Sequence, residues 1–252
     1  MEQEVIASGQ PLVNILLNIA GGIIVVIFDR TVIWAFKKYT GCTFKKIFGK
    51  HTANFKIIYG ELFRANDTSQ FPFEKPGSGY IFRSSSVIPF SDSRAASYIA
   101  FAFHKFTKKS PILLSDESCN STINFSYCSV GGRNNNKSTD IIESQLNRFI
   151  TFGTEAITFK SNDSFNYISN YEIDYCAIIK ITEGSNTKIC IAGLGEWGTS
   201  GGAWYIANKW RELQKIVNNK DFGAVIQVRT KIDDSAKLMS VIYGNNLIIN
   251  EV

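Results

Sequence analysis

Residues 188–210 read KICIAGLGEWGTSGGAWYIANKW, and they indicate the fold class more clearly than any other part of the chain. After Lys188, residues 189–192 form a short apolar run that is typical of a buried strand. Glycines and small polar residues follow, and residues 203–217 then show helical spacing of apolar side chains. That helix face is formed by Ala203, Ile206, Ala207, Trp210, Leu213 and Val217. A strand, a glycine-rich loop and a helix in this order predict one unit of an α/β fold.

Strand and helix patterns alternate through the rest of the chain after residue 79. We expect helices at residues 94–106 and 140–149, the second capped by Ser138 or Thr139. We expect strands at residues 80–83, 123–130, 156–159, 175–181, 188–192, 222–228, 238–243 and 247–250. The turn EGSNT between residues 181 and 188 predicts a hairpin. Crossover helices combined with hairpins predict an α/β sandwich around a mixed sheet.

Residues 11–28, PLVNILLNIAGGIIVVIF, form an uncharged run near the start of the chain. About 20 apolar residues in a helix cross a bilayer core, so we expect a transmembrane helix at residues 11–36. A cleaved signal peptide fits poorly, because the start MEQEV carries two glutamates. A buried core helix would show a polar stripe, and an interfacial helix would show a charged face. Only Asn14 and Asn18 interrupt the run.

Basic residues follow this run, whereas Glu2 and Glu4 precede it. The positive-inside rule then predicts a single-pass protein of the inner (cell) membrane with its C-terminal part in the cytoplasm. We therefore expect an extracytoplasmic segment at 1–10, the span at 11–36, a basic juxtamembrane linker at 37–78 and a cytoplasmic domain at 79–252. The expected partners are the lipid bilayer and, through small and amide residues of the helix, a homo-oligomer or membrane-protein complex.

The overall composition argues against several classes of site. The formal net charge is +5, but much of the excess lies in the juxtamembrane segment, which does not favour nucleic-acid binding. The five cysteines show no CxxC spacing, and the two histidines are far apart. We therefore expect no metal site.

Three junctions where a strand pattern gives way to a helix pattern are rich in small polar residues: residues 83–94, 131–139 and 193–202. Ligands of α/β proteins bind at the carboxyl ends of strands and at helix N-termini. The candidate ligand-binding residues are Arg83, Ser84, Gly131, Gly132, Arg133, Asn135, Thr139, Gly193, Gly195, Glu196, Trp197, Gly198, Thr199 and Ser200.

The third junction contains G-x-G-x-x-G at Gly193, Gly195 and Gly198, after a strand pattern and before a helix pattern. One interpretation is a loop that binds a phosphate or ribose of a nucleotide-like ligand, whose identity we leave unknown. The other is that the glycines only permit close packing of helix and strand. A complete dinucleotide-binding fold is not expected, because Arg229 and Lys231 end the next strand where a ribose-binding carboxylate would stand.

Glu196 is the best candidate for a reactive group in this loop. A carboxylate there could bind ribose hydroxyls or act as nucleophile or base in glycosidic cleavage, and it could equally be a helix-terminal charge. Trp197 could stack on a base or simply pack over the loop. Arg133 suits an anion or a solvated surface.

The stretch KICIAGLGEWGTSGGAWYIANKW, with SVGGRNNNKST at residues 129–139, resembles a group of prokaryotic membrane-anchored proteins with Rossmann-like domains. In some relatives such a domain occurs near nucleotide-signalling or defence modules. The resemblance covers residues 79–228 and is specific at residues 193–204. It implies a Rossmann-like three-layer sandwich that binds a ligand, and it supplies no catalytic residue.

Three functions follow as hypotheses. The first is a membrane-anchored sensor or effector that binds a nucleotide-like ligand, in antiviral defence or stress signalling. The second is a structural or assembly protein that oligomerises and binds a protein partner. The third is a nucleoside or NAD glycosidase that uses Glu196. We favour binding over catalysis and leave the question of an enzyme open.

Overall fold

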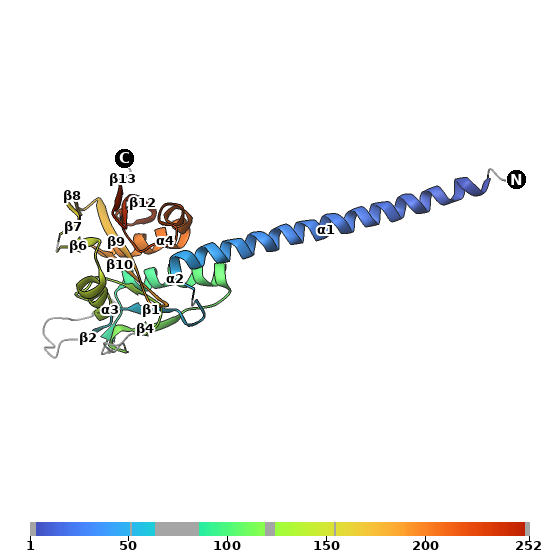
Figure 1. Cartoon of the computed structure of the whole chain (residues 1–252). Helices are drawn as coiled ribbons and strands as arrows, with labels where there is room; N and C mark the ends of the chain where they lie inside the picture. The colour runs from blue at the N-terminus through green and yellow to red at the C-terminus, as the bar shows by residue number, and fades with distance from the viewer. Residues whose placement is uncertain (1–3, 51, 64–85, 119–123, 154, 250–252) are drawn as a thin grey trace, which may run out of the picture. The chain divides into compact units, whose positions relative to one another are not determined.

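The computed structural model describes residues 4–50, 52–63, 86–118, 124–153 and 155–249 of the 252-residue chain (Figure 1). Contacts within the chain divide it into two units, Met1–Cys42 and Thr43–Val252. The first unit consists of most of helix α1 (Glu4–Phe48), whose last residues belong to the second unit. The second unit holds the sheet and the other helices.

The side chains of α1 that the structure describes include a long exposed apolar stretch. Ile23, Ile24, Val25, Val26, Ile27 and Phe28 are each more than half exposed. The expected span covers residues 11–36, and the side chains of residues 11–18, 20, 21 and 36 lie outside those that the structure describes. Among the described residues no helix combines the length and the hydropathy of a membrane span.

The second unit is built on an eight-stranded mixed sheet, which confirms the predicted mixed α/β architecture. From one edge to the other, its strands are β13 (Asn246–Ile249), β12 (Ile232–Tyr243), β11 (Phe222–Arg229), β9 (Ile173–Glu183), β10 (Asn186–Gly193), β5 (Tyr127–Val130), β1 (Lys56–Tyr59) and β4 (Ile112–Ser115). The last four run parallel, and the other pairings are antiparallel. The hairpin predicted from EGSNT is confirmed, because Glu183 pairs with Asn186.

Two smaller sheets complete the strands. One joins β2 (Leu62–Phe63) to β3 (Ser86–Val87). The other contains β6 (Ile150–Phe152), β7 (Ala156–Phe159) and β8 (Asn162–Ile168). Two single-turn helices, η1 (Thr52–Asn54) and η2 (Asp116–Ser118), lie in connections.

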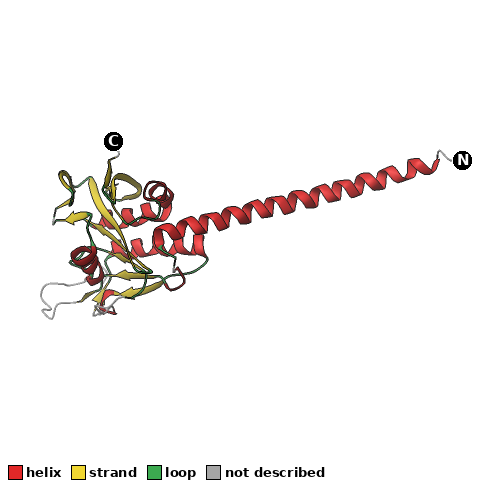
Figure 2. Cartoon of the chain, viewed as in Figure 1, coloured by secondary structure: helices red, strands yellow, loops and turns green. Residues whose placement is uncertain are grey.

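The two faces of the large sheet are covered by different elements, as the helices and strands in Figure 2 show. Helices α2 (Phe90–Thr107) and α4 (Glu196–Val217) and the end of α1 cover one face. Helix α3 (Lys137–Ile141), the π-helical turn η3 (Ile142–Leu146) and the β6–β7–β8 sheet cover the other.

Side chains of β10 demonstrate this division, because alternate residues of a strand point to opposite faces. Ile189 and Ile191 belong to the core beneath α2 and α4, whereas Cys190 and Ala192 belong to the core beneath α3. The first core is rich in aromatic rings: Phe44, near the end of α1, lies 5.3 Å from Phe103 and 5.5 Å from Trp210, ring centre to ring centre.

Helix α4 begins seven residues before the predicted start at residue 203, so the glycine-rich segment forms its first turns. Glycine is a poor helix former, which is why the pattern suggested a loop. Packing against the sheet overrides that preference. A Cβ on Gly201 would lie 2.5 Å from Val228 Cγ1, and one on Gly202 would lie 2.2 Å from Cys176 Sγ.

The predicted helix 140–149 is divided and starts earlier. Asn136, rather than Ser138 or Thr139, caps α3, because its Oδ1 accepts hydrogen bonds from the backbone N–H groups of Ser138 and Thr139. The chain then forms η3 and ends the helical segment before Asn147. Three successive asparagines, at residues 134–136, could each cap a helix that starts earlier than predicted. The sequence does not show which of the three is the cap.

Several strands lie where no strand was expected. β1 comes from the segment 37–78 that was expected to be a linker, and it lies between β5 and β4 in the sheet. β4, β6 and β8 were also missed, since short apolar runs without clear alternation look alike in helices, strands and loops. The strand expected at residues 80–83 lies outside the described residues.

Lys180 of β9 is buried beneath the helix ends of the second unit. Its ammonium donates hydrogen bonds to the carbonyl oxygens of Lys46 at 2.8 Å, Asn219 at 3.2 Å and Lys220 at 3.4 Å. These carbonyls lie in the last turn of α1 and just beyond α4, where helix dipoles favour a cation. Burial nevertheless lowers the pKa of Lys180 to about 8.

Candidate functional site

The carboxyl ends of β1, β5 and β10 meet at one edge of the sheet, because these neighbouring strands are parallel. The chain leaves β5 towards α3 on one face and leaves β10 towards α4 on the other. Neighbouring strands whose connections diverge in this way form a topological switch point, and ligands of open α/β sheets bind in the resulting crevice.

A cavity of about 400 Å³ opens at this switch point, and we call it the strand-end cavity. Its walls come from the segments that follow β1, β5 and β10, from the start of α2 and from the β6–β7 turn. The lining residues are Leu62, Pro89, Ser91, Asp92, Gly132, Arg133, Asn134, Asn135, Phe152, Gly153, Gly193, Leu194, Gly195, Glu196 and Thr199.

Asn136 fixes the loop that carries Arg133 and Asn135. Its Nδ2 donates to the carbonyl oxygens of Ile58 at 3.1 Å and Val130 at 2.8 Å, at the ends of β1 and β5. Asp116 holds the same corner from another side, because its carboxylate accepts from the backbone N–H groups of Glu61 and Lys137. The loop is therefore held in place by buried polar contacts on both sides.

Asp92, in the first turn of α2, is the most unusual group in the cavity wall. It is 3 % exposed, and its Oδ1 accepts a hydrogen bond from the Ser91 hydroxyl at 3.1 Å. Its Oδ2 has no hydrogen-bond partner among the described residues. Burial raises the pKa of Asp92 to about 6, and the nearby Asp116 also raises it, whereas the Ser91 hydroxyl and the backbone of Gly60 lower it.

Gly131 makes the close approach of Asp92 possible. Its φ is +101°, a conformation that L-residues rarely adopt, and a Cβ there would lie 2.5 Å from Asp92 Oδ2. The sequence placed Gly131 among the ligand-binding candidates. In the structure it is buried against Asp92 and supports the cavity wall from behind.

The backbone N–H groups of the glycine-rich loop face a carboxylate of the protein itself. Asp174, at the start of β9, accepts from Gly195 N at 3.0 Å and from Gly198 N at 2.6 Å. Because β9 is antiparallel to β10, its first residues lie beside the last residues of β10. Asp174 therefore occupies the position at the N-terminus of α4 where a phosphate would bind in a dinucleotide-binding loop.

The glycines of this loop also allow close backbone packing. A Cβ on Gly193 would lie 2.2 Å from the backbone nitrogen of Thr199, and one on Gly198 would lie 2.4 Å from the carbonyl oxygen of Tyr175. Both neighbours are backbone atoms, so neither can move aside easily. These contacts match the interpretation in which the glycines serve helix–strand packing.

Glu196 and Trp197 occupy the first turn of α4 and differ in surroundings. Glu196 is exposed and lines the strand-end cavity. Trp197 lies beneath the guanidinium of Arg94, whose Cζ is 4.8 Å from the ring centre. Arg94 also forms an ion pair with Asp233, a 3 %-exposed carboxylate that accepts from the Ser200 hydroxyl at 2.7 Å. Trp197 and Ser200 are thus parts of a packed polar network.

The structure brings seven of the fourteen candidate residues together in the wall of the strand-end cavity. The cavity is lined by Gly132, Arg133, Asn135, Gly193, Gly195, Glu196 and Thr199. Gly131, Thr139, Gly198 and Ser200 are buried behind its walls. Thr139, for example, donates to the carbonyl oxygen of Gly131 at 2.9 Å. Arg83 and Ser84 lie outside the described residues.

The sequence did not reveal that Asp174 contacts the glycine-rich loop. Asp174 lies in β9, and it meets the loop only because β9 and β10 form a hairpin. Asp92 falls within the junction at residues 83–94 but was not among the candidate residues. The described residues contain no group of three or more His, Cys, Asp or Glu side chains placed to hold a metal ion.

A second buried carboxylate, Glu143 on η3, lies near Arg133. It is 8 % exposed, and neither of its carboxylate oxygens has a partner in the described part of the chain. Burial raises the pKa of Glu143 to about 7, Arg133 lowers it and Asp140 raises it. Glu143 is not among the residues that line the strand-end cavity.

Comparison of the chain with protein-family models and with curated proteins found no match to either.

Proposed function

We propose that the second unit binds a nucleotide-like ligand in the strand-end cavity. The observation that carries this proposal is Asp92, a buried carboxylate that is among the residues lining the cavity and whose Oδ2 has no hydrogen-bond partner among the described residues. A buried polar atom without a partner costs free energy. A ligand that donates a hydrogen bond to this atom would recover that cost.

The chemistry of the walls favours a nucleoside part over a phosphate at this position. Asp92 and Glu196 accept hydrogen bonds from hydroxyl or amino groups, and Asn135 offers both a donor and an acceptor. Leu62, Phe152 and Leu194 supply apolar surface for a ring. Because Asp174 already takes two N–H groups at the start of α4, the ligand would bind through side chains more than through the glycine-rich backbone.

We further propose that α1 anchors this domain in the cell membrane with the domain in the cytoplasm. Two features support the anchor: the uncharged run at residues 11–28 and the six successive exposed apolar side chains from Ile23 to Phe28. Lysines beyond the run suit the cytoplasmic side. A bound ligand would then be sensed at the membrane, in keeping with a sensor or effector in prokaryotic defence or stress signalling.

A thermal-shift screen of the full chain in detergent tests the binding proposal. The probes are the four ribonucleosides, their 5′-phosphates, 3′,5′-linked dinucleotides and cyclic nucleotides. We expect at least one to raise the Tm, with an affinity that Asp92→Asn lowers about tenfold or more, since a hydrogen bond to a charged group contributes roughly 1.5–3 kcal/mol. The exposed Asp234→Asn is the matched control. The absence of any shift across the panel would contradict the proposal.

Membrane fractionation of cells that express the full chain tests the anchor. We expect the protein in the membrane fraction after an alkaline wash, and replacement of Ile24 and Val25 by aspartates should release it. Recovery of the unaltered chain in the aqueous fraction would contradict the anchor.

An assembly role is the second candidate, since the exposed apolar side chains of α1 also suit contact with another protein. That role predicts an oligomer or complex that forms without any nucleotide and survives Gly195→Val. The substitution would disturb the loop, because a Cβ on Gly195 would lie 2.7 Å from Asp174 Oδ2.

A further inference from the structure

The strand-end cavity is adjacent to two further hollows. A hollow of about 520 Å³, here named the connecting hollow, shares Leu194, Gly195 and Glu196 with it. A third, of about 690 Å³, is here named the hairpin hollow and shares Tyr171 and Thr230 with the connecting hollow. Each hollow shares lining residues with the next, and we call the three together the groove.

The hairpin hollow carries an excess of positive charge. Arg229, Lys231 and Lys237 line it with a single carboxylate, that of Glu172. All three cations are exposed, and none of them forms an ion pair with another described residue. Unpaired cations around a concave surface attract anions.

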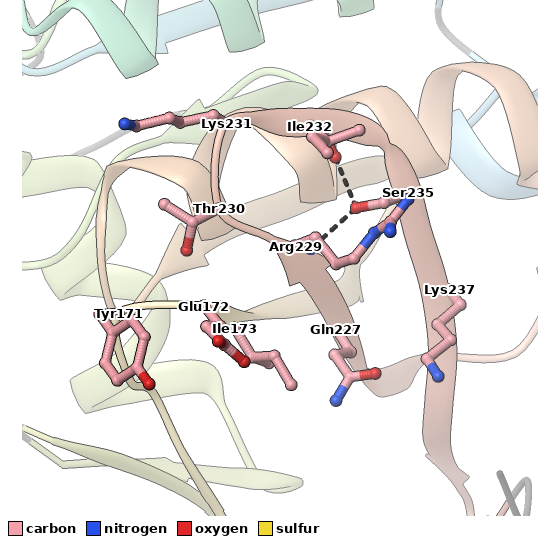
Figure 3. Close-up of a pocket in the computed structure, with 10 residues that line it drawn as sticks. All are labelled: Tyr171, Glu172, Ile173, Gln227, Arg229, Thr230, Lys231, Ile232, Ser235 and Lys237. Carbon is pink, nitrogen blue, oxygen red and sulfur yellow. Dashed lines mark hydrogen bonds between the residues drawn. The ribbon is translucent and has the colours of Figure 1, made fainter.

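The strands place two of these cations on the same side of the sheet. Figure 3 shows Arg229, Gln227 and Lys237 on neighbouring strands of the β11–β12 hairpin and Tyr171 on the opposite side of the view. Lys237 pairs directly with Gln227 in the register of β11 and β12. Tyr171 is 87 % exposed, and its ring is available for stacking.

Hydrogen bonds hold this end of the hairpin in shape. The Ser235 hydroxyl accepts from Arg229 N at 2.7 Å and donates to the carbonyl oxygen of Ile232 at 2.5 Å (Figure 3). The Gln227 Nε2 donates to the hydroxyl of Tyr175 at 2.9 Å. The backbone that presents Arg229 is therefore fixed before any ligand arrives.

The tip of the same hairpin differs from the other two hairpins of the sheet. Gly184 and Gly244 adopt the left-handed conformation in the β9–β10 and β12–β13 turns, each with φ of +58°. Lys231 adopts it in the β11–β12 turn, with φ of +69°. A side chain is strained in this conformation, where glycine is not. The turn therefore carries a cation at a cost in backbone energy.

The strand-end cavity has the opposite balance of charge, with Asp92 and Glu196 against Arg133. Building on the binding function proposed above, we propose that the groove takes one elongated ligand. Its nucleoside part lies in the strand-end cavity, and its ribose hydroxyls meet the connecting hollow, whose lining includes Glu155, Asp174 and Glu196 and no Lys or Arg. Its phosphates reach Arg229 and Lys237 in the hairpin hollow. The ligand class is a nucleotide with several phosphates or a phosphate-linked dinucleotide.

Titration calorimetry with matched probes tests this arrangement on the full chain. The probes are adenosine, adenosine 5′-triphosphate and a 3′,5′-linked diadenosine monophosphate, with the guanine series run in parallel. We expect a phosphorylated probe to bind at least about tenfold more tightly than its nucleoside at low salt, because charge-assisted contacts add to affinity. The difference should shrink as salt concentration rises.

Arg229→Ala combined with Lys237→Ala should remove most of the phosphate-dependent gain and leave the affinity of the nucleoside within about twofold. Lys215→Ala, which removes an exposed cation from α4, is the control and should change neither affinity. Because all three residues are exposed, Tm values should stay close to that of the unaltered chain.

The outcomes separate the two proposals. Failure of every nucleoside and nucleotide to bind would contradict the binding function itself. Nucleoside binding without a gain from phosphate, or a gain that survives the double substitution, would contradict the elongated-ligand proposal alone. Phosphate-dependent binding that Asp92→Asn leaves unchanged would also contradict it, because the ligand would then occupy the hairpin hollow only.

Discussion

The carboxylate of Asp174, at the start of β9, accepts a 2.6 Å hydrogen bond from the backbone N–H of Gly198, in the first turn of α4. The two residues are 24 positions apart in the chain and meet because β9 folds back beside β10. The N-terminus of α4 is thus stabilised by a negative charge from within the protein. This contact gives the glycine-rich loop a structural role.

Asp174→Ala should destabilise the second unit substantially. It removes the acceptor of two backbone N–H groups, and each charge-assisted bond contributes about 1.5–3 kcal/mol. We expect the free energy of unfolding to fall by about 3 kcal/mol, measured by chemical denaturation. Asp234→Asn, at an exposed position, should change it by less than about 0.5 kcal/mol. Equal stability of the two variants would refute a capping role for Asp174.

Gly198→Ala should destabilise the protein although alanine is the better helix former. A Cβ would lie 2.4 Å from the carbonyl oxygen of Tyr175 and 2.9 Å from Gly193 Cα, so the helix start would have to shift. We expect a loss of about 2 kcal/mol or more. Gly132→Ala is the control, because nothing lies within 4 Å of its added Cβ. A Gly198→Ala protein that gains stability would show that the added Cβ fits beside Tyr175 and Gly193, which contradicts the close packing inferred here.

We expect the free energy of unfolding to fall as pH rises from about 4 to 7, because the buried carboxyl groups of Asp92 and Glu143 have raised pKa values. Burial raises the pKa of Asp92 to about 6 and that of Glu143 to about 7. Both return to values near 4 on unfolding, so the folded state binds more protons in this window and unfolding becomes easier as pH increases.

Thermal unfolding of the full chain between pH 4.5 and 7.5 measures this dependence. The double variant Asp92→Asn with Glu143→Gln should show a flatter profile than the unaltered chain, whereas Asp234→Asn should keep the original slope. If the double variant reproduces the profile of the unaltered chain, the two carboxyls do not titrate as inferred.

Lys180→Met should loosen the junction between the end of α1 and the end of α4. The change leaves three carbonyl oxygens without the ammonium that now bonds them. We expect the free energy of unfolding to fall by about 2 kcal/mol, since buried unsatisfied acceptors are costly. Hydrogen exchange should rise at residues 44–48 and 214–220. Lys215→Met, at an exposed position, is the control and should leave both measurements unchanged. An equally small effect of Lys180→Met would show that the hydrogen bonds of the Lys180 ammonium do not hold the two helix ends together.

The elements with strong periodicity could be predicted from the sequence, and those without it could not. The hairpin of β9 and β10 follows from EGSNT between two apolar runs, and the core face of α4 follows from helical spacing that includes Trp210. The start of α4 could not be predicted, since the tolerance for Gly201 and Gly202 depends on their contacts with Val228 and Cys176. β1 has only four residues and no turn signal that links it to β5.

The candidate site was predictable only in part, for a related reason. The loops after β5 and β10 could be chosen from composition and position, because glycine and asparagine favour such junctions. The role of Asp174 depends on a long-range pairing, and the importance of Asp92 depends on its burial against Gly131. The cations of the hairpin hollow come from a strand register that the sequence does not specify.

Hydrogen exchange of the full chain with and without a bound nucleoside tests whether the ligand binds in the strand-end cavity. We expect slower exchange in both loops of the cavity, at residues 131–136 and 193–197, and loss of that protection in Asp92→Asn. Binding that leaves both loops unprotected, or that protects them equally in Asp92→Asn, would contradict the proposed site.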